Sequence, residues 1–277
     1  MEPHTVEIRS DKVIGTGYWT ELWKYRELLG FLAWRDLTVK YKQTALGVLW
    51  ILLQPLLTMA IFSFIFGKIG TFATGDIPYP LFALAGLVPW SYFSMIISYS
   101  SNSLITDSNL IKKVYCPRII IPLASVTAGI VDVGIVLGAF LCIRLLYGYG
   151  WHWEMLFGLL SLVWLVLATA GISFWLSALN VRYRDVRHTI PFLIQIGLFV
   201  SPIVYPLSLI QSSYQFLYAC NPLVGVIETF RWAMFTPEYS IEQSLVPIAI
   251  SFVSTALIFI GGVRFFHKME RGFVDSL

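Results

Sequence analysis

Six long apolar runs, separated by shorter polar segments, dominate the chain. They cover residues 46–67, 81–101, 119–147, 155–179, 190–206 and 245–265. Each run is close to the ~20 residues that a helix needs to cross ~30 Å of hydrocarbon. The pattern therefore predicts an all-α integral membrane protein with six transmembrane helices.

The basic residues between these runs predict the orientation. If both termini lie on one side, sixteen of the 19 Lys and Arg residues fall on that side, and only Lys68, Arg144 and Arg231 fall on the other. Basic residues resist translocation, so both termini are expected in the cytoplasm. We expect one transmembrane domain over 1–277, with a cytoplasmic segment at 1–45 and the six spans within 46–267.

Composition agrees with a membrane protein. The chain is 57% apolar and 13% charged, and its mean hydropathy is +0.73. No stretch outside the runs exceeds ~45 residues, which is too short for a separate enzymatic domain. The net charge of +3 follows the predicted topology, so nucleic acid is not an expected partner.

Residues 21–42 predict an amphipathic helix before the first span. Leu22, Tyr25, Leu29 and Leu32 recur at helical spacing, with Trp, Lys, Arg and Asp elsewhere. This suits a helix lying in the cytoplasmic headgroup layer. The alternative is a soluble amphipathic helix packed against a partner.

The segment 207–244 combines apolar and charged residues. Residues 216–235 are apolar enough to cross, yet they contain Asn221-Pro222, Glu228 and Arg231. A seventh crossing would also carry the last basic residues outside. We therefore expect a re-entrant helix pair that dips into the outer leaflet before the last span. Glu228 and Arg231 are three residues apart and are expected to form a local structural pair, with a functional role as the alternative.

The second run carries the sharpest polar pattern. Ser91, Ser94, Ser98 and Ser101 recur at helical spacing, with Tyr92 and Tyr99 seven residues apart beside them. Hydroxyls and aromatic faces would suit a path along which sugar units slide. Small residues also allow close helix packing in lipid. Both interpretations remain open at this point.

The first run offers weaker candidates, Gln54, Phe62 and Phe66, at similar helical phase. Gln54 can equally bond a neighbouring helix or the backbone that Pro55 leaves unpaired. Asp132 is the one acid deep in a predicted span, where a carboxylate is often functional. With Ser125 and Thr127 nearby and no basic partner in that run, a satisfied or protonated structural Asp is at least as good an interpretation.

Several kinds of chemistry lack their signatures. The three cysteines, Cys116, Cys142 and Cys220, lie far apart without metal-ligand spacing. The sequence contains no phosphate-binding G-x-x-x-x-G-K-[ST] loop, no dinucleotide fingerprint and no H-E-x-x-H motif. The chain is therefore not expected to be an enzyme, to bind a metal or to hydrolyse ATP itself.

Short strings in a fixed order resemble a known family. They are RDL at 35–37, YKQTALGVLW at 41–50, LQPL at 53–56, NLIKKVY at 109–115, PR at 117–118, LNVRYRDV at 179–186, SPIVYP at 201–206 and NPL at 221–223. Together they resemble the ABC type-2 permeases that export bacterial cell-surface polysaccharides, over about residues 25 to 271. The resemblance includes O-antigen, capsule and teichoic-acid exporters without separating them.

The resemblance implies the partners. A six-span permease of this kind forms a homodimer and docks two copies of a separate ATPase subunit, which binds ATP with magnesium, while this chain binds no cofactor. A pore between the protomers would pass a lipid-linked polysaccharide. Short cytoplasmic helices touch the ATPase in this family, and the matching segments are 102–117 and 180–188.

Two sets of site residues follow as expectations. The pore-lining candidates are Ser91, Tyr92, Ser94, Ser98, Tyr99, Gln54, Phe62 and Phe66. The ATPase-docking candidates are Asp107, Asn109, Lys112, Lys113, Arg182, Arg184 and Asp185. The alternative functions are an integral-membrane transferase, which would need a cluster of charged groups at one interface, and a proton-coupled carrier for lipid-linked sugars, which would rest on Asp132.

Overall fold

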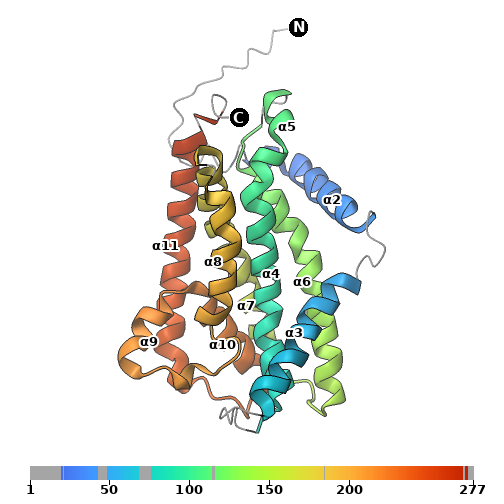
Figure 1. Ribbon diagram of the computed structural model, residues 1–277, viewed down its shortest axis with the longest axis vertical. Helices are drawn as coiled ribbons and strands as arrows, with labels where there is room; N and C mark the ends of the chain where they lie inside the picture. Colours follow the sequence, from blue (N-terminus) through green and yellow to red (C-terminus); the bar gives the residue numbers. More distant parts are fainter. Residues whose placement is uncertain are drawn as a thin grey trace.

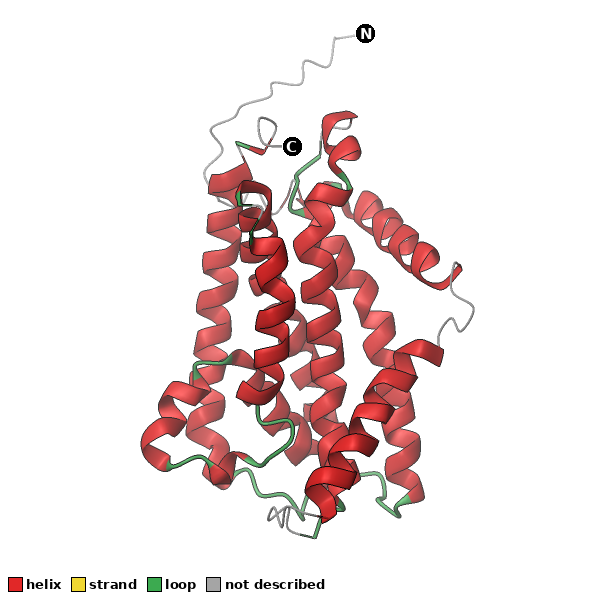
Figure 2. Ribbon diagram, viewed as in Figure 1, coloured by secondary structure: helices red, strands yellow, loops and turns green. Residues whose placement is uncertain are grey.

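The computed structural model describes residues 20, 22–42, 49–68, 76–113, 116–183, 185–270 and 272–273. In these ranges the regular structure is helical, without strands (Figure 2). The elements are α2 (Arg26–Lys42), α3 (Leu49–Lys68), α4 (Tyr79–Thr106), α5 (Ser108–Lys113), α6 (Ile120–Leu146), α7 (Met155–Arg182), α8 (Val186–Val200), η1 (Leu207–Leu209), α9 (Ser212–Ala219), α10 (Pro222–Phe235), η2 (Glu242–Ser244) and α11 (Leu245–Glu270).

Five of these helices are long and apolar enough to cross a membrane: α3, α4, α6, α7 and α11. They correspond to five of the six apolar runs. The run at 190–206 forms α8, an apolar helix of 15 residues, which ends at Val200 before Pro202 and Pro206. The all-helical membrane fold is thus confirmed, whereas α8 is shorter than the expected fifth crossing.

The bundle has two unlike ends (Figure 1). We call the end with α5, the start of α8 and the end of α11 the α5 end, and the opposite end, with α9 and α10, the α9 end. α4, α6, α7 and α11 run between the two ends, while α2 crosses the outside of the bundle obliquely near the α5 end.

The spans differ greatly in how deeply they are packed. In an 18-residue apolar window of each helix, 72% of the window is buried in α4 but only 6% in α3. α7 and α11 approach closely, since a Cβ on Gly171 would lie 2.8 Å from the Cα atom of Phe259. The core therefore centres on α4, α6, α7, α10 and α11, with α3 attached at its edge.

α10 is a short helix with a well-defined start. The Asn221 side chain accepts the Leu223 backbone N–H at 3.0 Å, and Pro222 occupies the first turn, which is the usual arrangement of an N-cap followed by proline. Twelve of its 14 residues are buried. α9 and α10 both remain at the α9 end, so neither forms a further crossing.

Candidate functional site

α5 is a short helix at the α5 end without a buried residue. It has six residues, and Asn109, Lys112 and Lys113 are all exposed. Arg182 and Asp185, between α7 and α8, are exposed as well, and Arg184 lies outside the described residues. The docking candidates that the structure describes thus gather at one end of the bundle, in two separate segments.

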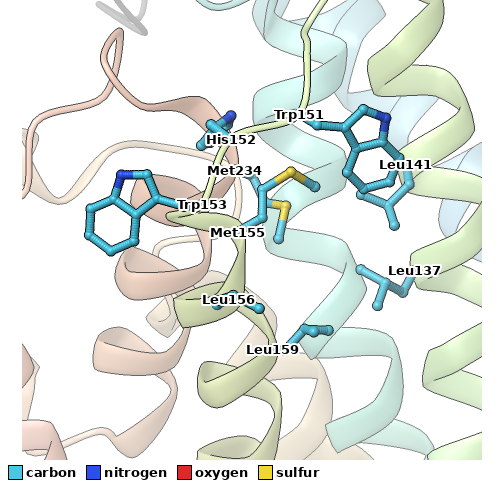
Figure 3. Close-up of a pocket in the computed structure, with 9 residues that line it drawn as sticks. All are labelled: Leu137, Leu141, Trp151, His152, Trp153, Met155, Leu156, Leu159 and Met234. Atoms are coloured by element: carbon cyan, nitrogen blue, oxygen red, sulfur yellow. The ribbon is translucent and has the colours of Figure 1, made fainter.

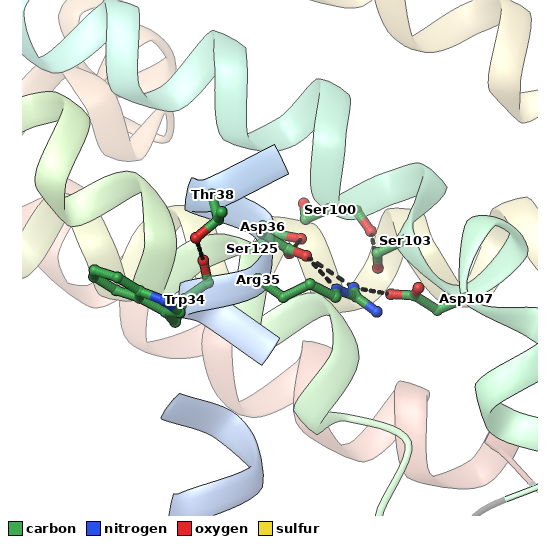
Figure 4. Close-up of polar contacts among 8 residues, drawn as sticks. All are labelled: Trp34, Arg35, Asp36, Thr38, Ser100, Ser103, Asp107 and Ser125. Atoms are coloured by element: carbon green, nitrogen blue, oxygen red, sulfur yellow. Dashed lines mark hydrogen bonds and ion pairs between the residues drawn. The ribbon is translucent and has the colours of Figure 1, made fainter. Parts of the chain in front are cut away.

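Asp107, another docking candidate, is ion-paired within the chain. Arg35 of α2 donates from Nη2 to Asp107 Oδ2 at 2.7 Å and to Asp36 Oδ1 at 2.8 Å (Figure 4). The hydrogen bond with Asp107 raises the pKa of the Arg35 guanidinium above its ordinary value, and Asp36 adds to this against partial burial. Arg35 is therefore a permanent cation between two carboxylates.

Asp132 has the basic partner that its own run lacks. Lys40 Nζ lies 2.7 Å from Asp132 Oδ2, and the Tyr41 hydroxyl donates to Asp132 Oδ1. Burial raises the pKa of Tyr41, with Asp132 adding to the effect, so the phenol stays a neutral donor. Both partners come from α2, about 90 residues earlier in the chain. The basic partner of Asp132 thus comes from outside its own run.

The apolar stripe of α2 faces the bundle. Leu32 is buried against Ile120 and Ala124 of α6, and Leu22 and Leu29 pack beside it. Large apolar side chains also lie exposed on α2, at Phe31, Trp34 and Val39. The structure does not confirm the one-sided pattern expected of an interfacial helix, since apolar residues occur on both faces.

The serine stripe of α4 does not form a single exposed surface. Ser98 is exposed, Ser91 and Ser94 are half-buried, and Ser101 is buried. Their hydroxyls largely serve their own helix, as in Ser91 donating to the Val88 carbonyl at 2.9 Å. Ser100, outside the stripe, donates to Ser173 Oγ of α7 at 2.7 Å.

The two tyrosines of α4 lie in different surroundings. Tyr92 is 1% exposed and donates to the Val126 carbonyl of α6 at 2.9 Å. Tyr99 is 58% exposed, and Lys40 Nζ lies 5.6 Å from its ring centroid. Tyr92 thus belongs to the α4–α6 packing, whereas Tyr99 is exposed on the surface of α4.

The α3 candidates also divide. Gln54 is exposed, whereas Phe62 is buried and Phe66 is half-buried. The two rings meet edge-on with centroids 6.0 Å apart. Whether these residues line a pore stays a prediction.

At the α9 end, Glu228 and Arg231 are both buried in α10, with 3.8 Å between Glu228 Oε1 and Arg231 Nη1. Glu228 Oε2 accepts from the Tyr239 hydroxyl at 2.9 Å and from Ser244 Oγ at 2.8 Å. Arg231 Nη2 donates to the Ile203 carbonyl at 2.6 Å, and its guanidinium carbon lies 3.7 Å from the Phe82 ring centroid. The expected local pair is present, and it also joins α10 to α4 and to the loops on both sides.

Arg144 and His152 form a second buried polar group at this end. Arg144 Nε donates to the Met234 carbonyl at 2.8 Å, and its Nη2 lies 3.2 Å from His152 Nδ1. His152 Nε2 lies 2.9 Å from the Ala233 carbonyl. With its proton on Nε2, the imidazole donates to the Ala233 carbonyl and accepts from Arg144 at Nδ1. The last carbonyls of α10 thus receive donors that a helix end otherwise lacks.

Beside this group lies a cavity of about 320 Å³ between α6, α7 and α10. Figure 3 shows its lining, which is apolar except for His152. The lining residues are Leu137, Leu141, Trp151, His152, Trp153, Met155, Leu156, Leu159 and Met234. Among the described residues no group of three His, Cys, Asp or Glu side chains is placed to hold a metal ion.

Comparison with known proteins identifies the family. Residues 27–235 match the model of the ABC-2 type transporter family. The O-antigen export system permease protein RfbA of Myxococcus xanthus is 29% identical over 93% of this chain and 98% of its own length. RfbA of Klebsiella pneumoniae is 28% identical over 91% of this chain and 95% of its own.

A relative with another substrate in its name gives a similar match. The polysialic acid transport protein KpsM of Escherichia coli is 27% identical over 87% of this chain and 93% of its own. The family match covers most of the chain and includes α2, four of the five long spans, and the short helices α9 and α10. The chain therefore belongs to the ABC-2 type transporter family.

Proposed function

We propose that this chain is the transmembrane subunit of an ATP-driven exporter of lipid-linked cell-surface polysaccharide in the bacterial inner membrane. The observation that carries the proposal is the near full-length similarity to permeases named for two different polysaccharides. ATP, with magnesium, is hydrolysed on a separate subunit present in two copies. The exported substrate is thus a polysaccharide attached to a lipid anchor.

The proposed topology puts the α5 end in the cytoplasm. Lys112, Lys113, Arg187 and Arg264 lie near this end, and of the described cations Lys68, Arg144 and Arg231 lie near the other. α8, with the loop that follows it, makes the fifth of the six crossings. α2 lies at the cytoplasmic interface, and α9 and α10 form the re-entrant pair in the outer leaflet.

The proposed polysaccharide path runs along one face, where α8, α4 and α3 lie side by side (Figure 1). α3 and α8 expose large apolar side chains, such as Trp50 and Phe64 on α3 and Phe192 on α8. Ser98 and Tyr99 of α4 are exposed as well. A second copy related by a two-fold axis would cover these faces and present the same groups twice.

The test of function is deletion and complementation in the source cell. Loss of the gene should abolish surface polysaccharide while its lipid-linked precursor accumulates inside, and inactivation of the partner ATPase should give the same phenotype. Normal surface polysaccharide without this chain would refute the proposal.

The path is tested with the two tyrosines as a matched pair. Tyr99→Ala should reduce export of long chains at unchanged dimer yield, and Ser98→Trp should block export. Tyr92→Ala removes a buried ring and its bond to α6, so export should fall only in proportion to the folded protein. If Tyr99→Ala also acts only through protein yield, the α4 surface serves packing and not transport.

The topology is tested by cysteine labelling with an impermeant thiol reagent. A cysteine at Ser212, exposed on α9, should react from outside, and one at Asn109, exposed on α5, only from inside. Labelling of position 109 from outside would overturn the orientation.

Asp132 bears on the carrier alternative. Its carboxylate is matched by Lys40 and Tyr41 in a contact between two helices. A proton relay needs a carboxylate that can exchange protons during transport, whereas this carboxylate is engaged by both partners. The contacts favour a structural role for Asp132, and hence the ATP-driven permease.

A further inference from the structure

The exposed helix α5 is tied to the bundle at both ends. Before it, Asp107 ends α4 and accepts from Arg35 of α2 at 2.7 Å. After it, the Arg118 backbone N–H donates to Glu270 Oε1 of α11 at 2.8 Å, and the Arg118 guanidinium donates to the Glu270 carbonyl. A displacement of α5 therefore acts on α2 through one tether and on α11 through the other.

The tether to α11 leads into the tightly packed part of the molecule. α11 lies against α7, where a Cβ on Gly262 would lie 2.5 Å from the Gly171 carbonyl oxygen. Protein interiors of this density do not deform continuously, so a local push moves α11 only together with α7. This tether anchors α5 and gives it little freedom to move alone.

The tether to α2 leads to the loosest part. Only Leu32 and Ala33 of α2 are buried. α2 is otherwise held by polar contacts to α6, with Ser125 Oγ 3.4 Å from Asp36 Oδ2, and Lys40 Nζ 2.7 Å from Asp132 Oδ2. The chain then continues through residues 43–48 into α3, the span with 6% of its apolar window buried.

From this contrast we propose that Arg35 is the positioning residue through which ATP-driven displacement of α5 reaches α2 and the span α3. The inference rests on the proposed function, because it needs an ATPase that moves α5. Arg35 touches neither ATP nor glycan: its ion pair with Asp107 makes α2 follow α5. In this proposal the Lys40–Asp132 contact is the pivot on α6, and α3 follows α2 because it is the next helix in the chain.

The test is charge exchange in the complete complex with its ATPase. Arg35→Glu or Asp107→Arg should leave complex recovery and ATP hydrolysis near wild type while export falls at least about fivefold, the lower range of a typical coupling energy. The double variant Arg35→Glu with Asp107→Arg restores the attraction with reversed polarity and should recover most of the export. Arg35→Lys, which keeps the charge, should retain part of it.

Arg26→Glu is the matched control. It makes the same charge reversal on the same helix, and among the described residues the Arg26 guanidinium donates to the nearby Trp23 carbonyl, at 3.4 Å. Export should be unchanged. Arg118→Ala weakens the other tether and should lower complex recovery and export together, without separating ATP hydrolysis from export.

A second readout does not depend on the glycan. A spin label at Leu49, the exposed first residue of α3, should change its mobility on addition of ATP to the reconstituted complex. This change should disappear in Arg35→Glu and return in the double variant. An equal response in wild type and Arg35→Glu would overturn the proposal, as would an export loss in Arg35→Glu that merely follows complex recovery.

The proposed function and the coupling role of Arg35 can be refuted separately. If the proposed function is wrong, the wild-type complex itself exports no polysaccharide. If only the coupling role of Arg35 is wrong, the wild type exports and the Arg35 variants export equally well for the amount of complex present.

Discussion

α2 and α10 are both non-crossing helices attached to the bundle through charged residues, but they are attached in opposite ways. α2 has 17 residues and buries two, and its charges pair with other helices at half-exposed positions. α10 has 14 residues and buries twelve, and its charges pair with each other inside the protein. Both helices use an Arg or Lys and a carboxylate, so residue type does not distinguish them.

The difference lies in what happens when a pair is broken. Arg35 and Lys40 can turn to water when they lose a partner, so the free energy cost is small and α2 can shift. Arg231 and Glu228 have no access to water, and a single one left behind is an uncompensated buried charge. The ion pairs at the α5 end can thus rearrange at a small free energy cost, whereas those at the α9 end cannot.

The largest effect should come from Arg231→Ala. Loss of this cation leaves Glu228 buried without its counter-charge, at a cost of about 3–5 kcal/mol. The detergent-extracted protein should aggregate, or lose its monodisperse peak at a much lower temperature. Adding Glu228→Gln should recover part of the loss, because the amide keeps contacts to Tyr239 and Ser244 without the charge. Wild-type thermal behaviour of Arg231→Ala would show that the α9 end is not fixed by this pair.

A smaller loss is expected from Gly86→Ala. A Cβ at Gly86 of α4 would lie 2.8 Å from Arg231 Nη2 and 3.0 Å from the Ile203 Cα. The extra methyl must displace the guanidinium from the Ile203 carbonyl, and overpacking of this kind costs about 1–3 kcal/mol. Gly30→Ala on α2 is the matched control, because a Cβ there meets nothing within 4 Å. Equal melting temperatures for the two variants would contradict the comparison.

Asp132→Asn should destabilise less than Arg231→Ala. It removes the counter-charge of Lys40, but the Lys40 side chain is 23% exposed and can reach water. A lost charged hydrogen bond costs about 1–3 kcal/mol, and this exposure favours the lower part of that range. Thermal unfolding of Asp132→Asn, Lys40→Met and the double variant measures the coupling of the pair. Strictly additive losses would mean that the two side chains do not interact in solution.

The smallest effect concerns two native cysteines. Cys116, near the α5 end, is buried, and burial raises the pKa of its thiol, with Glu270 adding and Arg118 opposing. Because the thiolate is the reactive form, a raised pKa slows alkylation at a given pH. N-ethylmaleimide should therefore modify the exposed Cys220 first, as followed by peptide mass spectrometry. Modification of Cys116 at the same rate would reveal that the start of α6 opens readily.

The sequence predicts the long helices well because apolar length is a local property. α3 and α6 begin and end within a few residues of their runs. α4, α7 and α11 also begin close to the start of their runs, but they continue past the ends to Thr106, Arg182 and Glu270. Helix propensity and capping, not hydropathy, decide where a helix ends once it leaves the hydrocarbon. α8 is the exception, because its run includes two prolines after Val200 that end the helix.

The polar contacts could be foreseen only in part. Glu228 and Arg231 are three residues apart, so helix geometry alone suggests their pairing. Arg35 with Asp107 and Lys40 with Asp132 are separated by 72 and 92 residues, and no local rule joins them. The available signal is that a buried acid in a span requires a cation, and Lys40 lies in the last turn of the helix before the first span. The burial of Tyr92 depends on which face α4 turns to α6, and the serine stripe leaves this open.

The contacts of Arg144 and His152 also impose an order on biosynthesis. The carbonyls they bind on α10 come 90 and 81 residues later in the chain. While α6 and α7 are being made, both side chains lack these acceptors. The end of the α6–α7 hairpin is therefore completed only when α10 has been translated and has returned to it. A chain that stalls before α10 leaves this guanidinium and imidazole without the carbonyls that they bind in the complete fold.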